Sequence, residues 1–194
     1  VFLDGIIRPE WFGANHVDDT AAIQAAIDIS ASIDSPMILF SNTIYYATTL
    51  NIPAGTNTLT FKGSKTDVSS FRSGIKQLSS ATDSLIKISS EADSKNYCYG
   101  INFDGIGLAG NYNQYGIEMH GCVRGYISHI QIQAFLVGIY ADNIWDYAIE
   151  DLNVFNCSTL NDTNSYGVIF TSNITHQDNC NAIHITNSHF EGNH

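Results

Sequence analysis

Two short alternating segments place acidic, imidazole and aromatic side chains at matching positions. One carries Glu118 and His120, and the other carries Tyr140 and Asp142 at the equivalent places. Cleavage of a glycosidic bond needs a proton donor, a base or nucleophile, and a flat ring beneath the sugar. We therefore predict that Glu118, Asp142 and His120 are catalytic and that Tyr140 contacts substrate. The alternative is that all four are solvated residues on an exposed strand face.

Trp145 is a second candidate for substrate binding. It lies in the segment 142–147, which we interpret as a turn, and carboxylates flank it. An aromatic ring in that setting suits stacking against a sugar, whereas burial in the core is the alternative. If Glu118 and Asp142 lie on adjacent strands, two residues out of step, their α-carbons are roughly 8 Å apart. Such a separation fits the carboxylate pair of an inverting glycosidase.

These segments belong to a loose repeat that indicates stacked strands. One pattern is a glycine followed by alternating residues, and the other reads apolar, polar, polar, apolar, polar, apolar. A period near 22 residues, with several short strands in each period, is typical of a solenoid in which neighbouring coils bury a shared core. The first pattern occurs at 116–120, 138–142 and 167–171, and the second at 127–132, 149–154 and 185–190, with an earlier copy at 103–108.

The repeat predicts an all-β fold, a right-handed parallel β-helix. Inward residues of successive coils then form ladders, such as Ile117, Ile139 and Val168, and Ile130 and Leu152 become stacked core positions. Two other folds are less compatible with the sequence. The signature of a leucine-rich repeat is absent, and a β-sandwich would need tight hairpin turns between its strands.

An amphipathic helix precedes the strands. The residues 20–32 follow acidic capping residues and place apolar side chains on one face, so we expect a helix that covers the open end of the first coil. Shorter strands are expected at 37–40, 43–49, 58–61 and 85–88, and a long excursion at 64–84 with one strand near 75–78. We divide the chain into an N-terminal segment with its capping helix (1–36) and the first coils of the β-helix (37–194), truncated at the C-terminal end.

Composition narrows the functional classes. The chain has 194 residues, 44% of them hydrophobic, and a net charge of −11, which disfavours nucleic acid as a partner. No apolar run is long enough for membrane insertion. The four cysteines stand singly, without metal-ligand spacing, so we expect no metal and no cofactor and interpret the cysteines as small buried hydrophobes.

The N-terminal segment carries a recognisable motif. Residues 9–14 read PEWFGA and residues 18–27 read DDTAAIQAAI. This pattern resembles the N-terminal signature of the pectate-lyase-like β-helix superfamily, and within it most resembles phage tailspikes and capsule depolymerases. Two departures concern the cap: the link Asn15–Val17 is short, and Ser41–Thr43 replaces the expected Pro-Ala-Gly turn.

The resemblance implies a homotrimeric protein of the virion tail, joined to other tail proteins through a preceding N-terminal region. It implies binding and cleavage of a bacterial surface polysaccharide (capsule, O-antigen or exopolysaccharide) by hydrolysis or by β-elimination. Two alternatives stay open, because a fold does not fix a function. One is a spike or adhesin that binds glycans without cleaving them, and the other is a secreted polysaccharide lyase.

Overall fold

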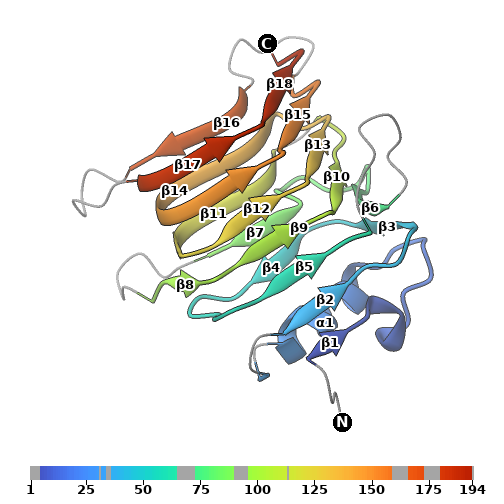
Figure 1. Cartoon of the computed structure of the whole chain (residues 1–194). Coiled ribbons are helices and arrows are strands. Elements are labelled where there is room, and N and C mark those ends of the chain that lie inside the picture. Colours follow the sequence, from blue (N-terminus) through green and yellow to red (C-terminus); the bar gives the residue numbers. More distant parts are fainter. Residues whose placement is uncertain are drawn as a thin grey trace.

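The chain forms a parallel β-helix, as the repeat predicts (Figure 1). The computed structural model describes residues 5–30, 32–33, 36–64, 73–89, 96–112, 114–158, 166–172 and 180–193. Strands far apart in the sequence pair side by side, and the pairs that these residues form are parallel. Each coil thus hydrogen-bonds to the coil before it and the coil after it.

The strands form two sheets that wrap around the core. The larger sheet runs in the order β1 (Ile6–Ile7), β2 (Met37–Leu39), β5 (Thr60–Lys62), β9 (Asn102–Asp104), β12 (Tyr126–Ser128), β14 (Val137–Glu150), β11 (Tyr115–Val123), β7 (Ile86–Ile88) and β4 (Leu50–Ile52). Beside this path, β16 (Tyr166–Thr171) and β17 (Asn181–Thr186) pair with β14, and β8 (Cys98–Tyr99) pairs with β11. The second sheet runs β18 (His189–Glu191), β15 (Asn153–Phe155), β13 (Gln131–Gln133), β10 (Gly107–Ala109), β6 (Gly74–Gln77) and β3 (Ile44–Ala47).

Ladders of aliphatic side chains fill the core. Ile117 lies opposite Ile139, and Ile139 lies opposite Val168, which confirms the predicted register. Ile130 and Leu152 are fully buried, also as predicted. Burial of one such side chain contributes about 1.5 to 3 kcal/mol, so the stacking of coils is the main stabilising interaction of the fold.

Glycine opens each copy of the first strand pattern because the coils touch there. A β-carbon on Gly116 would lie 2.6 Å from the carbonyl oxygen of Gly138, and one on Gly138 would lie 2.5 Å from that of Gly167. Any larger side chain would push two coils apart. The repeated glycine therefore sets how closely the coils stack.

The second strand pattern differs from the prediction. Each copy is two short strands joined by a corner, because His129, Asp151 and Asn187 adopt left-handed backbone conformations with φ of 53°, 50° and 49°. The corner amide of His129 donates to the carbonyl of Glu150 in the next coil at 3.1 Å. Asn, Asp and His adopt this conformation more often than β-branched residues, which clash with the backbone there.

The expected turn at 142–147 is also wrong. These residues are part of β14, which bends at Asn143 and Asp146, both with φ of 55°. The bends let one continuous strand turn from one face of the β-helix to the next while it keeps pairing with β11 and β12.

The helix α1 (Thr20–Ser30) and the 3-10 helix η1 (Pro9–Phe12) lie at the N-terminal end of the β-helix (Figure 1). The buried face of α1, including Ile23 and Ile27, joins the core, as expected of a cap. The helix ends before Ser32, the predicted limit, because Ser32 donates to Ile29 in a tighter turn at 3.1 Å.

The cap contains an internal hydrogen-bonding centre. The carboxylate of Glu10 accepts from the hydroxyls of Ser41 and Tyr45, and Tyr45 is fully buried. Ser41 belongs to the segment that replaces the expected turn. Its hydroxyl ties the first coil to the PEWFGA motif.

The remaining expectations have mixed outcomes. The strand expected near 75–78 is β6, whereas residues 65–72 of the excursion lie outside the described residues. Cys98 lies opposite Cys122, and these two and Cys157 are fully buried free thiols. Cys180 is half-buried, so the interpretation as buried hydrophobes is confirmed for three of the four.

Candidate functional site

The predicted catalytic residues lie on one outer face, formed by β7, β11 and the first half of β14. Because side chains alternate along a strand, the residues between the core isoleucines point outward. Glu118 lies opposite Tyr140, and His120 lies opposite Asp142. The parallel register therefore brings together all four residues that the sequence predicts for this face.

His120 lies between two carboxylates. Its Nε2 atom is 2.9 Å from Oε1 of Glu118, and its Nδ1 atom is 3.5 Å from Oδ2 of Asp142. The side chains of Glu118 and Asp142 are only 12% and 17% exposed, so solvent screens these interactions weakly. The imidazole thus connects two carboxylates on neighbouring coils.

The preceding coil supplies two further groups that the sequence interpretation missed. The hydroxyl of Ser84 donates to Oε2 of Glu118 at 2.6 Å, and Nζ of Lys87 is 3.5 Å from the same oxygen. Lys87 is also 3.5 Å from Asp83. Lys87 could have been found by extending the ladder of the first pattern back to β7, whereas Ser84 follows no pattern.

These contacts fix the charge states of the site. The hydrogen bond from His120, helped by Ser84 and Lys87 and opposed by burial, lowers the pKa of Glu118 to about 2. The same bond to Glu118 raises the pKa of His120 despite burial, and Asp142 adds to the rise. Burial opposes the charged form of Lys87, but Glu118 and Asp83 outweigh it and raise its pKa. At neutral pH Glu118 is ionised, and His120 holds a proton more firmly than a free histidine.

Two tyrosines stack against each other beside the charged groups. The rings of Tyr115 and Tyr140 are stacked, with centroids 4.9 Å apart and an interplanar angle of 10°. The His120 ring centroid is 5.8 Å from that of Tyr140. Stacked rings next to a carboxylate and an imidazolium can hold a sugar ring against acid and base groups. We name the surface of Ser84, Lys87, Tyr115, Glu118, His120, Tyr140 and Asp142 the acidic strip.

Trp145, the other predicted substrate contact, lies farther along β14. It pairs in register with Val123 and Asn181, beyond the bend at Asn143, and packs edge-on against Tyr97 with centroids 5.0 Å apart. The ring is half-buried, so neither of the two environments considered for it describes it fully. The ring contact between Trp145 and Tyr97 lies outside the acidic strip.

A second charged cluster lies on another face. His129 contacts Asp104 through Nδ1 and Asp151 through Nε2, both at 3.3 Å, and Lys62 pairs with Asp104. The side chains of His129 and Asp151 are 38% and 43% exposed, which makes this cluster more open than the acidic strip. It repeats the arrangement of one imidazole between two carboxylates.

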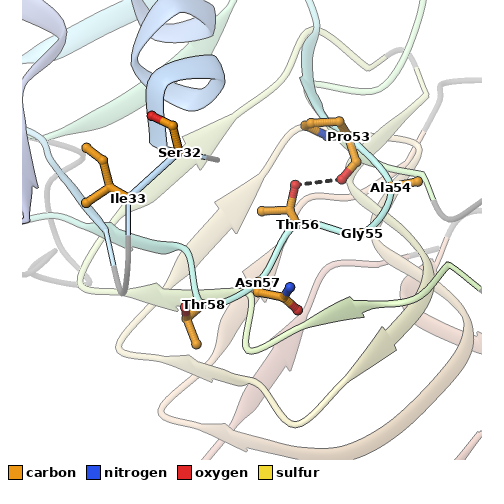
Figure 2. Close-up of a pocket in the computed structure, with 8 residues that line it drawn as sticks. All are labelled: Ser32, Ile33, Pro53, Ala54, Gly55, Thr56, Asn57 and Thr58. Atoms are coloured by element: carbon orange, nitrogen blue, oxygen red, sulfur yellow. Dashed lines mark hydrogen bonds between the residues drawn. The ribbon is translucent and has the colours of Figure 1, made fainter.

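A cavity of about 410 Å³ lies near the N-terminal cap, between the residues after α1 and the loop that follows β4 (Figure 2). Thr56 closes that loop by donating its hydroxyl to the carbonyl of Pro53 at 2.6 Å. Its lining residues carry no titratable side chain, so the cavity offers no acid or base chemistry. They are Ser32, Ile33, Pro53, Ala54, Gly55, Thr56, Asn57 and Thr58.

In the described parts of the chain, no three His, Cys, Asp or Glu side chains are arranged to hold a metal ion. The described helices include none with the length and apolar character of a transmembrane span.

Solved structures of phage proteins share this fold. ORF18 of Geobacillus virus E2 superposes with a TM-score of 0.81 at 21% identity, over 95% of this chain and 36% of that one. The tailspike gp49 of the Acinetobacter baumannii phage Fri1, a capsular polysaccharide depolymerase, matches with a TM-score of 0.52 at 10% identity, over 99% of this chain and 47% of that one. A glycosyl-hydrolase-like protein of Parabacteroides merdae matches with a TM-score of 0.55 at 12% identity, over 96% of this chain and 98% of that one.

The chain therefore spans about a third of the phage ORF18 protein and about half of the tailspike. No protein-family model matches the sequence, and no curated protein matches it. At these identities the likeness establishes the fold, a β-helix of the kind that phage tailspikes use.

Proposed function

We propose that this protein is a tailspike-like polysaccharide depolymerase that binds a bacterial surface polysaccharide along the acidic strip. The observation that carries the proposal is the contact of His120 with both Glu118 and Asp142, next to stacked tyrosine rings on an outer face. Acid and base groups beside an aromatic surface are the requirements of glycoside cleavage. The shared fold with a capsular polysaccharide depolymerase supports the same conclusion.

The protonation states assign different roles to the three groups. Glu118, with a pKa of about 2, is ionised and suits the role of base or nucleophile. The raised pKa of His120 favours its protonated form, which suits the role of proton donor. Asp142 is the second carboxylate, on the far side of the imidazole from Glu118.

The test is the release of reducing ends from the purified surface polysaccharide of a susceptible bacterial strain. Glu118→Gln and Asp142→Asn should each lower turnover by a factor of roughly 10² to 10⁴, because proton transfer acts in the transition state. His129→Asn is the matched control, since it alters the similar cluster on the other face and should leave the rate unchanged. Unchanged rates in both strip variants would place the chemistry elsewhere in the protein.

Binding without cleavage separates the main alternative from this proposal. A glycan-binding spike would retain the polysaccharide on the wild-type protein and release no reducing ends from it. A secreted lyase would yield an unsaturated product with absorbance near 235 nm.

We further propose that the intact protein is a homotrimer of the virion tail. The cap motif, which resembles that of tailspikes, and the shared fold support this assembly. Light scattering of the intact protein at micromolar concentration should give the mass of a trimer. A monomer at that concentration would contradict the assembly, but not the site.

A further inference from the structure

The acidic strip and its flanking carboxylate carry more negative than positive groups. The carboxylates of Asp83, Glu118 and Asp142 surround Lys87 and His120, which together carry at most two positive charges. Lys87 is 3.5 Å from both Asp83 and Glu118, and His120 contacts both Glu118 and Asp142. Both cations are thus already engaged with protein carboxylates. An anionic ligand group here would meet excess negative charge.

One acceptor of the strip is unused. Oδ2 of Asp142 faces His120, whereas Oδ1 is buried without a hydrogen-bond partner among the described residues. That oxygen is buried, so a ligand hydroxyl or amino group meets instead the exposed parts of the Glu118 and Asp142 carboxylates, whose side chains are 12% and 17% exposed. The strip therefore offers acceptors and lacks an unengaged cation among its described members.

The stacked rings of Tyr115 and Tyr140 add affinity that does not depend on ligand charge. Because the two rings cover each other's inner faces, their edges and outer faces are what the C–H groups of a sugar ring can contact. The charged groups next to the rings therefore discriminate between sugars. One of them, His120, is in ring contact with Tyr140.

We propose that the sugar unit bound on the acidic strip is non-anionic: a neutral or amino sugar that presents O–H or N–H donors. Uronate, sulfated and phosphorylated units are disfavoured at this position. The inference rests on the proposed depolymerase function and specifies the substrate class of the same site.

The substrate class decides the reaction. β-Elimination removes the proton next to the carboxylate of a uronate, so a unit without that carboxylate lacks the required acidic proton. Cleavage on the strip is then hydrolysis. His120 gives the proton of Nδ1, the nitrogen with the longer carboxylate contact, to the leaving glycosidic oxygen. The bond between that oxygen and the anomeric carbon breaks, and water adds its hydroxyl to that carbon. A strip carboxylate takes the remaining proton of the water and returns it to His120, which balances the step.

The experiment measures binding of three oligosaccharides to the full chain by calorimetry at pH 6. The probes are glucosamine hexamer, cellohexaose and hexagalacturonate. We expect hexagalacturonate to bind at least about tenfold more weakly than cellohexaose, from repulsion of the order of 1 kcal/mol per close charge pair in water. Added salt should narrow this difference, since it screens exposed charges.

Two variants with the same net charge test where the discrimination arises. Asp142→Asn removes a charge from the strip and should bring hexagalacturonate within about threefold of cellohexaose. Asp151→Asn removes a charge from the other face and should leave the tenfold difference. Asparagine also suits the left-handed backbone at position 151, so the control keeps its corner.

The outcomes separate this inference from the proposed function. Tighter binding of hexagalacturonate than of cellohexaose, or an unchanged difference in Asp142→Asn, would overturn the charge argument and leave polysaccharide binding standing. Absence of binding for all three probes would overturn the substrate class proposed here, whereas the proposed function stands or falls on the purified surface polysaccharide.

Discussion

Substituting Glu118 by glutamine should destabilise the protein in a strongly pH-dependent way. Nε2 of His120 is 2.9 Å from the Glu118 carboxylate, and Coulomb attraction at that distance is about 6 kcal/mol for an effective dielectric constant near 20. Burial of the carboxylate cancels part of it. A pKa lowered from 4.5 to about 2 corresponds to a net gain of about 3 kcal/mol for the ionised form. We expect Glu118→Gln to lose about 2 to 3 kcal/mol, since the amide retains some hydrogen bonding.

The sign of the pH dependence follows from the two shifts. The pKa of Glu118 is lowered, so its contribution is complete above pH 4.5 and is lost as the pH falls towards 2. The pKa of His120 is raised, so the contribution of its charge is complete below pH 6.5 and is lost as the pH rises through the raised value. The difference between wild type and Glu118→Gln should therefore be largest between about pH 4.5 and 6.5.

Urea unfolding followed by tryptophan fluorescence, at intervals from pH 3 to pH 8, measures this difference. Asp151→Asn is the control, because its pair with His129 is about 40% exposed and such pairs contribute less than about 1 kcal/mol. A loss below about 1 kcal/mol at pH 5.5, or one that does not change with pH, would refute the ion pair as the source of the shifted pKa values.

Three further predictions concern the stacked core. Leu152→Asp should cost several kcal/mol, because it buries an unpaired carboxylate at a fully buried position, and wild-type thermal unfolding would contradict the register. Gly138→Ala should cost about 1 to 3 kcal/mol, since its β-carbon meets the Gly167 carbonyl oxygen at 2.5 Å; an unchanged urea midpoint would show that the coils can separate there. Burial raises the pKa of Cys157 to about 11, so this thiol should resist a disulfide reagent at pH 8 until urea is added, and mass spectrometry of the labelled peptide would reveal earlier reaction.

The sequence by itself determined the architecture, because a solenoid has a short repeating signal. Alternation places Ile117 and Ile139 inward and Glu118 outward. The period of about 22 residues sets Ile117 and Ile139 on neighbouring coils. Register then follows from the burial of one face, since a slip of one residue would expose the isoleucines. The pairing of His120 with Asp142 could be predicted for the same reason.

The corners could not be predicted in the same way. The second strand pattern has no glycine at His129 or Asp151, so nothing local distinguishes a corner from a continuous strand. The left-handed conformation is favoured only when the corner amide finds a carbonyl in the next coil, as His129 does at Glu150. That partner exists only in the stacked structure.

The chemistry of the site depended most on tertiary structure. Ser84 and Lys87 reach Glu118 from the preceding coil, across more than 30 residues of sequence, and their hydrogen bond and charge help to hold that carboxyl ionised. A pKa depends on the distances and burial of all neighbouring groups, which a repeat pattern does not encode. The sequence thus selected Glu118, His120, Tyr140 and Asp142, whereas the stacking of three coils added the other residues of the acidic strip and shifted the pKa values within it.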